Sequence, residues 1–390
     1  MTEAAAEREG RARFASVADA VAALRPEAPV HCLRPHAARR AAAEFVSAFP
    51  GRVLYAVKCN PHPALLDALA AGGIHGFDVA AMREVRQVQR LLPGARCYFM
   101  NPVKARSAIE TAYRDGGVRH FVVDHPTELG KLVEILGRDP EVTVVVRMTT
   151  SATGAAIHLS DKFGAGQAMA AEILGEAAAL GFRPGLGFHV GSQCTVADAY
   201  RAALANAAGV ADAAGVRLQC LDVGGGFPAT YAGPPAPPLA AFVDAIREGL
   251  AALDLAPDAE ILAEPGRALV AHASTLITRV QLRKGGRLYI NDGVYGSLSE
   301  AKLARIPLPA RLIRPDGAPA SEQRAFELAG PTCDSLDILP DPVTLPTDAD
   351  EGDWIAIDAL GAYSTALATD FNGCQPETFI EVADEPPARV

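Results

Sequence analysis

Residues 52–71 read RVLYAVKCNPHPALLDALAA, and this stretch holds the repeating unit on which the fold depends. Its first part, Arg52–Val57, is a short run of apolar and β-branched residues, which predicts a buried strand. The part that begins at Pro63 carries apolar residues at the three- and four-residue spacing of a helix. The stretch therefore predicts one strand followed by one helix.

The same unit returns from about residue 30 to residue 270, with helical spacing in segments such as AMREVRQVQRLL, PTELGKLVEILG and GQAMAAEILGEAAALG. Eight strand–helix units over roughly 240 residues are typical of an α/β fold of the (β/α)8 TIM-type barrel class. The number of strands favours this barrel over an open doubly wound sheet. The predicted barrel strands are Arg52–Val57, Gly76–Ala80, Arg96–Met100, His120–Val123, Val142–Arg147, Gly185–Val190, Leu218–Val223 and Glu260–Ala263.

After about residue 272 the pattern changes. The runs STLITRVQLR, GRLYIND, ARLIR and DWIAIDAL alternate apolar with polar residues and are interrupted by Gly and Pro, which predicts a mainly antiparallel β-domain. The proline-rich stretch LPDPVTLP near residue 339 favours a surface loop. We expect the barrel at residues 33–272 and a discontinuous β-domain made of residues 1–32 and 273–390.

Composition narrows the class of protein. The net charge of −10 comes without a long basic run, which argues against nucleic acid or an anionic membrane as partner. No run of about 18 uncharged apolar residues is present, and the charged N-terminus lacks the apolar centre of a secretory signal. The seven cysteines are scattered without a CxxC pair, which favours reduced thiols in the cytoplasm over disulfides or a metal site.

Polar or ionisable residues follow nearly every predicted barrel strand. Because the carboxyl ends of barrel strands meet at one rim, we expect most of these side chains to form a single site. A salt bridge at the rim is the expected role for Asn101 and Asp124. The strand-end residues are Lys58, Asn60, Asp78, Asn101, Asp124, Arg147, His189, Ser192, Gly224–Gly226, Glu264 and Arg267.

Three of these features suggest a chemistry. A desolvated lysine amine such as that of Lys58 can bind an aldehyde covalently, although a lysine at a strand end can also simply extend to solvent. The Gly224–Gly226 run offers closely spaced backbone N–H groups that suit a phosphate. Glu264 could contact a pyridine nitrogen and Arg267 a phosphate, although such a pair is also common as a surface ion pair.

Eight segments in order resemble the ornithine/lysine/arginine decarboxylase group, whose fold is alanine-racemase-like (fold type III). The resemblance runs from about residue 30 to residue 380 and therefore covers most of the chain. The segments are YAVKCN, GFDVA, FHVGSQC, LDVGGGFP, AEPGR, NDGVYGS, GPTCDSLD and GAYSTALATDFNG.

The resemblance implies a pyridoxal 5'-phosphate (PLP) enzyme in which Lys58 binds the cofactor. His189 would stack on the cofactor ring, Glu264 would keep the ring nitrogen protonated, and Asp78 and Arg147 would support the site. The residues implied to hold the phosphate are Ser192, Gly224, Gly225, Gly226, Arg267 and Tyr363.

The resemblance also implies a head-to-tail homodimer with shared active sites. Cys333 and Asp334 would reach the neighbouring subunit's site, and Cys333 would protonate the carbanion that remains after carbon dioxide leaves. Glu264 favours decarboxylation over racemisation, since a racemase of this fold typically sets a cation against the ring nitrogen. The retained Lys58 disfavours a non-catalytic regulator of the same fold.

One segment departs from the family pattern. Members that act on diamino acids carry an acidic residue about nine positions after the tyrosine of NDGVYGS, and it binds the distal ammonium of the substrate. Here Tyr295 is present, but the matching position is Ala304, beside Arg305. Asp334 remains as a second partner for the ammonium, and Glu300 could substitute if the local helix is rearranged.

We therefore expect ornithine or lysine as substrate, giving a diamine for polyamine biosynthesis. The alternatives are a diaminopimelate-like or acylated amino acid, or one with an acidic distal group that Arg305 would favour.

Overall fold

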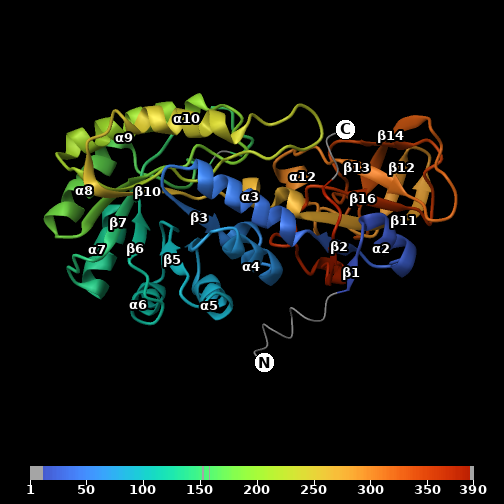
Figure 1. Ribbon diagram of the computed structural model, residues 1–390, viewed down its shortest axis with the longest axis horizontal. Helices are drawn as coiled ribbons and strands as arrows, with labels where there is room; N and C mark the ends of the chain where they lie inside the picture. Colours follow the sequence, from blue (N-terminus) through green and yellow to red (C-terminus); the bar gives the residue numbers. More distant parts are fainter. Residues whose placement is uncertain (1–11, 152, 158, 387–390) are drawn as a thin grey trace.

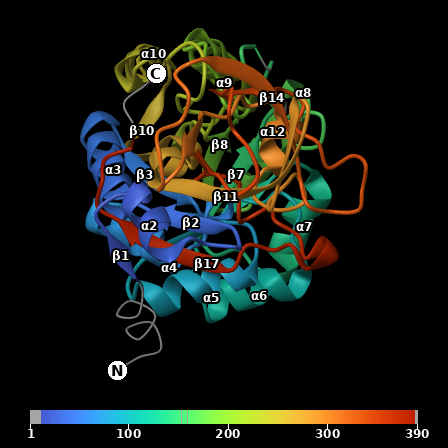
Figure 2. The same cartoon turned by 90° about the vertical axis from the view of Figure 1, so that its right-hand side faces the viewer.

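The computed structural model describes residues 12–151, 153–157 and 159–386. Two parts lie side by side along the longest axis of the molecule, a barrel wrapped by helices and a separate β-sheet (Figure 1). Viewed from the sheet end, β2, β11 and β17 cross in front of the barrel and its helices (Figure 2).

Eight parallel strands close the barrel in the order β10-β3-β4-β5-β6-β7-β8-β9, which confirms the predicted TIM-type barrel. Most of their residues are apolar and buried, as expected of parallel strands covered by helices. The strands are β3 (Arg52–Ala56), β4 (Gly76–Val79), β5 (Arg96–Phe99), β6 (His120–Val123), β7 (Thr143–Arg147), β8 (Arg183–Gly187), β9 (Leu218–Asp222) and β10 (Leu255–Ala263).

The covering helices bury one apolar face each. In α5, Val85, Val88 and Leu91 are buried at three-residue intervals, while the charged residues between them face outward. Helices α3, α4 and α7 begin with proline, which is tolerated in the first turn because no N–H is needed there. The helices are α3 (Pro35–Ala48), α4 (Pro63–Ala71), α5 (Met82–Leu91), α6 (Arg106–Arg114), α7 (Pro126–Leu136), α8 (Gln167–Ala179), α9 (Asp198–Ala214) and α10 (Leu239–Leu250).

Two barrel strands differ from the sequence expectation by more than two residues at one end. Strand β8 ends at Gly187 rather than at Val190, because the chain turns at His189, whose Nδ1 accepts a hydrogen bond from the N–H of Gly191 (3.0 Å). Strand β10 begins at Leu255, earlier than the predicted Glu260, and its pairing with β9 is interrupted between these two residues. The early end of β8 places His189 in a loop above the barrel rim.

The second part is a mainly antiparallel sheet, as predicted, with the order β1-β17-β2-β11-β12-β14-β15 and with β16 joining β11 to β13. Within the described ranges, only β1/β17, β17/β2 and β12/β14 of this sheet pair in parallel. The strands are β1 (Arg13–Phe14), β2 (Val30–Leu33), β11 (Ser274–Lys284), β12 (Arg287–Ile290), β13 (Ala310–Ile313), β14 (Gln323–Ala329), β15 (Val343–Pro346), β16 (Trp354–Ile357) and β17 (Thr378–Val382).

The prediction of a surface loop near residue 339 is wrong in part, because Val343–Pro346 form β15 and pair with β14. Short helices α2 (Val17–Leu24), α11 (Arg267–Val270) and α12 (Ser299–Leu303) complete the fold. The domain limits at residues 33 and 272 stay predictions, and the outermost parts of the predicted β-domain, residues 1–11 and 387–390, lie outside the described residues.

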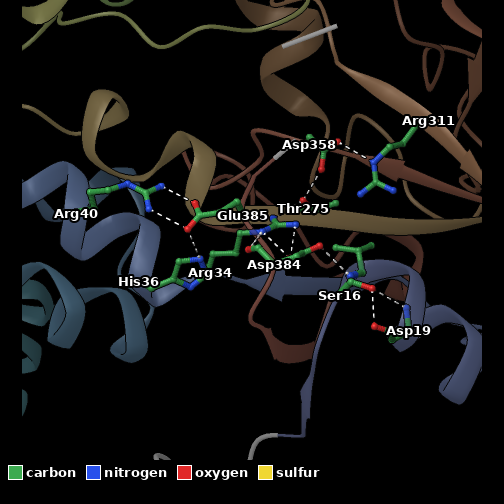
Figure 3. A network of polar contacts seen from close by, with 11 residues as sticks. Ser16, Asp19, Arg34, His36, Arg40, Thr275, Arg311, Asp358, Asp384 and Glu385 are labelled. Atoms are coloured by element: carbon green, nitrogen blue, oxygen red, sulfur yellow. Dashed lines mark hydrogen bonds and ion pairs between the residues drawn. The ribbon is translucent and has the colours of Figure 1, made fainter. Parts of the chain in front are cut away.

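A buried arginine joins the two parts (Figure 3). Arg34 precedes α3, and only 1% of its side chain is exposed. Its Nε donates to Asp384 Oδ1 (3.0 Å) and its Nη1 to Thr275 Oγ1 (2.7 Å), so it contacts the segment after β17 and strand β11 at once. Thr275 in turn donates to Asp358 (2.6 Å). A charge this deeply buried is tolerated because it is paired and hydrogen-bonded, and it fixes the first barrel helix against the sheet.

No helix in the described part of the chain is long and apolar enough to cross a bilayer.

Candidate active site

A small cavity opens at the carboxyl end of the barrel strands. The β-domain closes one side of it, because Tyr363 donates its backbone N–H to Cys59 O (2.9 Å) and Gly361 accepts from Asn60 Nδ2 (2.8 Å). Ten residues line the cavity: Ala56, Lys58, His189, Ser192, Gly226, Phe227, Glu264, Gly266, Arg267 and Tyr363.

Lys58 lies in η1 (Val57–Cys59), the short 3-10 turn that follows β3, and half of its side chain (47%) is exposed to the cavity. Its amine forms an ion pair with Asp78 at the end of β4, whose side chain is buried. Desolvation lowers the pKa of this amine, but the carboxylates of Asp78 and Glu264 more than offset it and hold the pKa above its ordinary value. Asp78 therefore holds Lys58 both in place and in its charged form.

Glu264 follows β10 and is half-buried, and it interacts with the charge of Asp222 of β9. Asp222 accepts a hydrogen bond from the N–H of Gly224 (2.8 Å). Burial raises the pKa of Glu264 well above its usual range, and the charges of Asp222 and Asp78 raise it further. Its Oε1 atom is buried and has no hydrogen-bond partner among the described residues. A protonated ring nitrogen would supply the missing donor and the missing positive charge.

His189 is held as a neutral imidazole. Burial lowers its pKa well below the usual value, and the charges of Arg147 and Lys58 lower it further. Because Nδ1 accepts from Gly191, the ring proton resides on Nε2. A flat, neutral imidazole at this position can stack on an aromatic cofactor ring without adding a positive charge beside it.

Arg267 begins α11, and its side chain is only 3% exposed. Its Nη1 donates to Tyr231 Oη and to Glu300 Oε2 (2.7 Å each), while its Nη2 donates to Ser192 Oγ (3.2 Å). The Nε atom is buried without a hydrogen-bond partner among the described residues. A bound phosphate would satisfy this donor.

The glycine run between β9 and the next loop packs against the other loops of the rim. A Cβ on Gly224, whose φ is +69°, would lie 2.1 Å from Phe188 O. A Cβ on Gly225 would lie 2.6 Å from Glu264 O and 3.1 Å from His189 Nε2. Only glycine fits, because the backbone itself approaches the site. The Gly224–Gly226 backbone and Arg267 Nε suit a phosphate, and Glu264 Oε1 suits a protonated pyridine nitrogen. These groups together fit a phosphorylated pyridine such as PLP.

Other strand-end residues lie outside the cavity lining. Arg147, at the end of β7, is half-buried beside the Phe163 ring (5.6 Å) and acts on the site through its charge. Asp124 accepts from the N–H of Gly164 (2.9 Å), which is a loop contact rather than the expected salt bridge. The backbone oxygen of Asn101 accepts from Lys104 Nζ (3.1 Å), and its uncharged side chain forms no ion pair with any described residue.

Tyr295, Cys333 and Asp334 form a second group, on the surface of the sheet part. The Tyr295 hydroxyl donates to Asp334, and this bond lowers the pKa of that carboxyl. Cys333 is exposed and donates its N–H to Asn372 Oδ1 (3.1 Å). None of the three lines the cavity that contains Lys58.

The segment around α12 does not provide a replacement ammonium clamp. Ala304 is buried and Arg305 is exposed with φ +50°. Glu300, suggested above as a substitute, instead pairs with Arg267 because α12 directs it toward the cavity wall.

The sequence did not predict this ion pair, nor the part that Tyr231 and Asp222 play in the site. Both missed residues lie within or next to the quoted LDVGGGFP segment, so their proximity to the glycine run was the available signal.

Comparison with known proteins places the chain in a family. Residues 36–271 match the family described as pyridoxal-dependent decarboxylase, pyridoxal binding domain. An ornithine decarboxylase of Panagrellus redivivus is 34% identical over 83% of this chain and 79% of its own length. A lysine/ornithine decarboxylase of Selenomonas ruminantium is also 34% identical, over 86% and 84%.

Solved structures of similar proteins support the same family assignment. A lysine/ornithine decarboxylase from Vibrio vulnificus in complex with putrescine is 31% identical, with a TM-score of 0.80 over 95% of this chain and 99% of the other. The structure of SrLDC with PLP and cadaverine is 29% identical, with a TM-score of 0.79 over 96% and 94%. The groups around the cavity that contains Lys58 fit PLP, the cofactor named in the SrLDC structure. The chain therefore belongs to the pyridoxal-dependent decarboxylase family and is a PLP-dependent amino-acid decarboxylase.

Proposed function

We propose that Lys58 binds PLP and that the enzyme decarboxylates an L-diamino acid, with ornithine or lysine the first candidates. The observation that carries the proposal is that three groups meet at one cavity: the amine of Lys58, Oε1 of Glu264 and Nε of Arg267. Neither Oε1 nor Nε has a hydrogen-bond partner in the described part of the chain. An aldehyde, a pyridine nitrogen and a phosphate are the matching parts of PLP.

Bound PLP supplies an electron-withdrawing ring that takes up the charge left on Cα when carbon dioxide departs. Glu264 holds a proton on the ring nitrogen and so maintains this electron-withdrawing power. His189 would pack against the ring face, and Asp78 would orient the amine of Lys58. The phosphate end would be held by Arg267, Ser192, Tyr363 and the Gly224–Gly226 backbone.

The substrate is proposed from two observations. Relatives at 34% identity are named ornithine decarboxylase and lysine/ornithine decarboxylase. Asp334, whose pKa is lowered by the Tyr295 hydrogen bond, is an anion suited to a distal ammonium. The alanine at position 304 removes one expected carboxylate partner, so an amino acid with a neutral or acidic distal group is the competing candidate.

We further propose a homodimer in which each subunit completes the site of its partner. Cys333 is exposed rather than directed at Lys58, as expected if it serves a neighbouring molecule. Exposed apolar side chains in the same part of the chain, Leu336 and Phe371, support an interface there. Cys333 would then protonate Cα in the partner's site. A cytoplasmic location also stays a proposal, supported by seven free cysteines.

A substrate panel tests the proposed activity. Release of carbon dioxide is measured with ornithine, lysine, arginine, diaminopimelate and their acylated forms, using Lys58→Ala as the control. The proposal predicts the highest kcat/KM for ornithine or lysine and no release by the control. Preference for an acylated or acidic substrate would overturn the diamino-acid assignment. Epimerised substrate without carbon dioxide, detected by chiral chromatography, would instead indicate a racemase.

A further inference from the structure

Glu300 and Arg267 form an ion pair almost entirely removed from solvent. The Arg267 side chain is 3% exposed and that of Glu300 is 12% exposed. Both carboxylate oxygens engage the guanidinium, Oε2 through Nη1 at 2.7 Å and Oε1 through Nη2. Water and salt screen such a pair poorly, so the carboxylate balances most of the charge that Arg267 carries.

The pair leaves one edge of the guanidinium available. Glu300 takes the edge formed by Nη1 and Nη2, and Nη2 also reaches Ser192 Oγ (3.2 Å). The remaining Nε is buried and unpartnered among the described residues. An anion can therefore bind the Nε–Nη2 edge, beside Ser192, while Glu300 stays where it is.

This arrangement has an energetic consequence for a phosphate. The phosphate would meet a guanidinium that a carboxylate already neutralises, and the two anions would then share one cation. Like charges held close together in a dry site repel each other appreciably. The cofactor-free protein has no phosphate to balance Arg267. If Glu300 were also absent, Arg267 would be a buried cation without a counter-charge, and this would destabilise the fold.

We infer that Glu300 is a built-in counter-ion of Arg267 that stabilises the protein when no phosphate is bound and weakens its hold on the cofactor phosphate. This inference rests on the proposed role of Arg267 as a phosphate ligand. It differs in sign from a positioning role, in which Glu300 would strengthen phosphate binding by orienting Arg267. It differs also from a purely structural role, in which its loss would weaken stability and leave the phosphate contribution unchanged.

The test uses Glu300→Gln, which removes the charge but keeps the size and one hydrogen-bond acceptor. Dissociation constants are measured by absorbance for PLP and for pyridoxal, which lacks the phosphate and so isolates the contribution of the phosphate subsite. The matched control is Glu327→Gln, which removes a carboxylate paired with Arg287 on the surface of the sheet part.

Glu300→Gln is expected to lower the Kd for PLP by roughly tenfold or more and to leave the Kd for pyridoxal within about twofold. The cofactor-free variant is expected to unfold a few degrees, roughly 2–4 °C, below the wild type, and inorganic phosphate should raise its unfolding temperature more than that of the wild type. Glu327→Gln should change none of these quantities.

An unchanged or raised Kd for PLP in Glu300→Gln would overturn the inference while leaving the proposed function intact, provided that the wild type binds PLP more tightly than pyridoxal. A wild type that binds the two compounds equally, or binds neither, would instead contradict the proposed phosphate site itself and the inference with it.

Discussion

The amine of Lys58 and the carboxylate of Asp78 form an ion pair across two neighbouring barrel strands, β3 and β4. The parallel register pairs Ala56 with Asp78, so the turn after β3 returns Lys58 over the end of β4. Asp78 is buried while Lys58 faces the cavity, and the charge of Asp78 raises the pKa of the amine. Asp78 therefore sets the pH at which the amine is free to react.

Replacing Asp78 with Asn should make Lys58 reactive at lower pH. Removing an adjacent carboxylate lowers the pKa of an ammonium by roughly one to three pH units. The rate of cofactor attachment, followed by absorbance across pH, should shift its midpoint downward by that amount. A pH profile identical to that of the wild type would show that Asp78 does not govern the amine.

Gly225→Ala should weaken cofactor binding. The added Cβ would lie 2.6 Å from Glu264 O and 3.1 Å from His189 Nε2, so the loop or the imidazole must move. Such overpacking costs about 1–3 kcal/mol, which corresponds to a rise in the Kd for PLP of roughly 5- to 150-fold. Gly209→Ala in α9 is the control, because its Cβ would meet open space. Equal affinities in the two variants would contradict the tight approach of this loop.

His31 should make the fold sensitive to acid. It is buried between the hydroxyls of Ser274 (3.2 Å) and Ser297 (2.8 Å), and burial lowers its pKa from 6.5 to about 4. The unfolded chain binds the proton first, so the stabilisation is complete above pH 6.5 and is lost as the pH falls through 4. The loss amounts to roughly 3 kcal/mol.

The measurement for His31 is urea unfolding between pH 4 and 7, compared with His31→Gln, which does not titrate. The comparison is needed because burial raises the pKa of Asp292 to about 6, and stability from that group is lost as the pH rises through 6, the opposite direction. Parallel pH curves for the wild type and the variant would show that His31 does not contribute.

Mixing two inactive variants should restore activity if active sites are shared. In a hybrid of Lys58→Ala with Cys333→Ala, one of the two sites has both residues intact. Free exchange of subunits should therefore recover about one quarter of wild-type activity. Carbon dioxide release before and after mixing measures this, with each variant alone as the control. Hybrids that stay inactive would contradict shared sites. They would show that Cys333 and Lys58 act within one subunit, or that Cys333 contributes nothing to the site of the partner.

Much of the barrel was predictable, because each strand and each helix carries its own local apolar pattern. His120–Val123 was predicted to the residue, and most other strands to within one or two. The sheet part was less predictable. Strand β17 (Thr378–Val382) pairs with β2 (Val30–Leu33), nearly the whole chain away, and nothing in either local pattern indicates that partner. Prolines around Val343–Pro346 concealed β15 because proline usually interrupts strands.

The strand-end rule found most of the cavity lining, since Lys58, His189, Glu264 and Arg267 all follow barrel strands. The Arg267–Glu300 pair was not predictable, because it joins α11, which follows the last barrel strand, to α12 in the other part of the molecule. The charge interaction between Asp222 and Glu264 depends on the register of β9 with β10, which periodicity does not determine.

Chemical trapping of the cofactor tests the central claim most directly. The protein loaded with PLP is reduced with borohydride, digested, and its peptides are mapped by mass spectrometry. The account predicts a single pyridoxyl label, on Lys58, and no label in Lys58→Ala. A label on any other lysine, or a wild-type protein that takes up none, would contradict it.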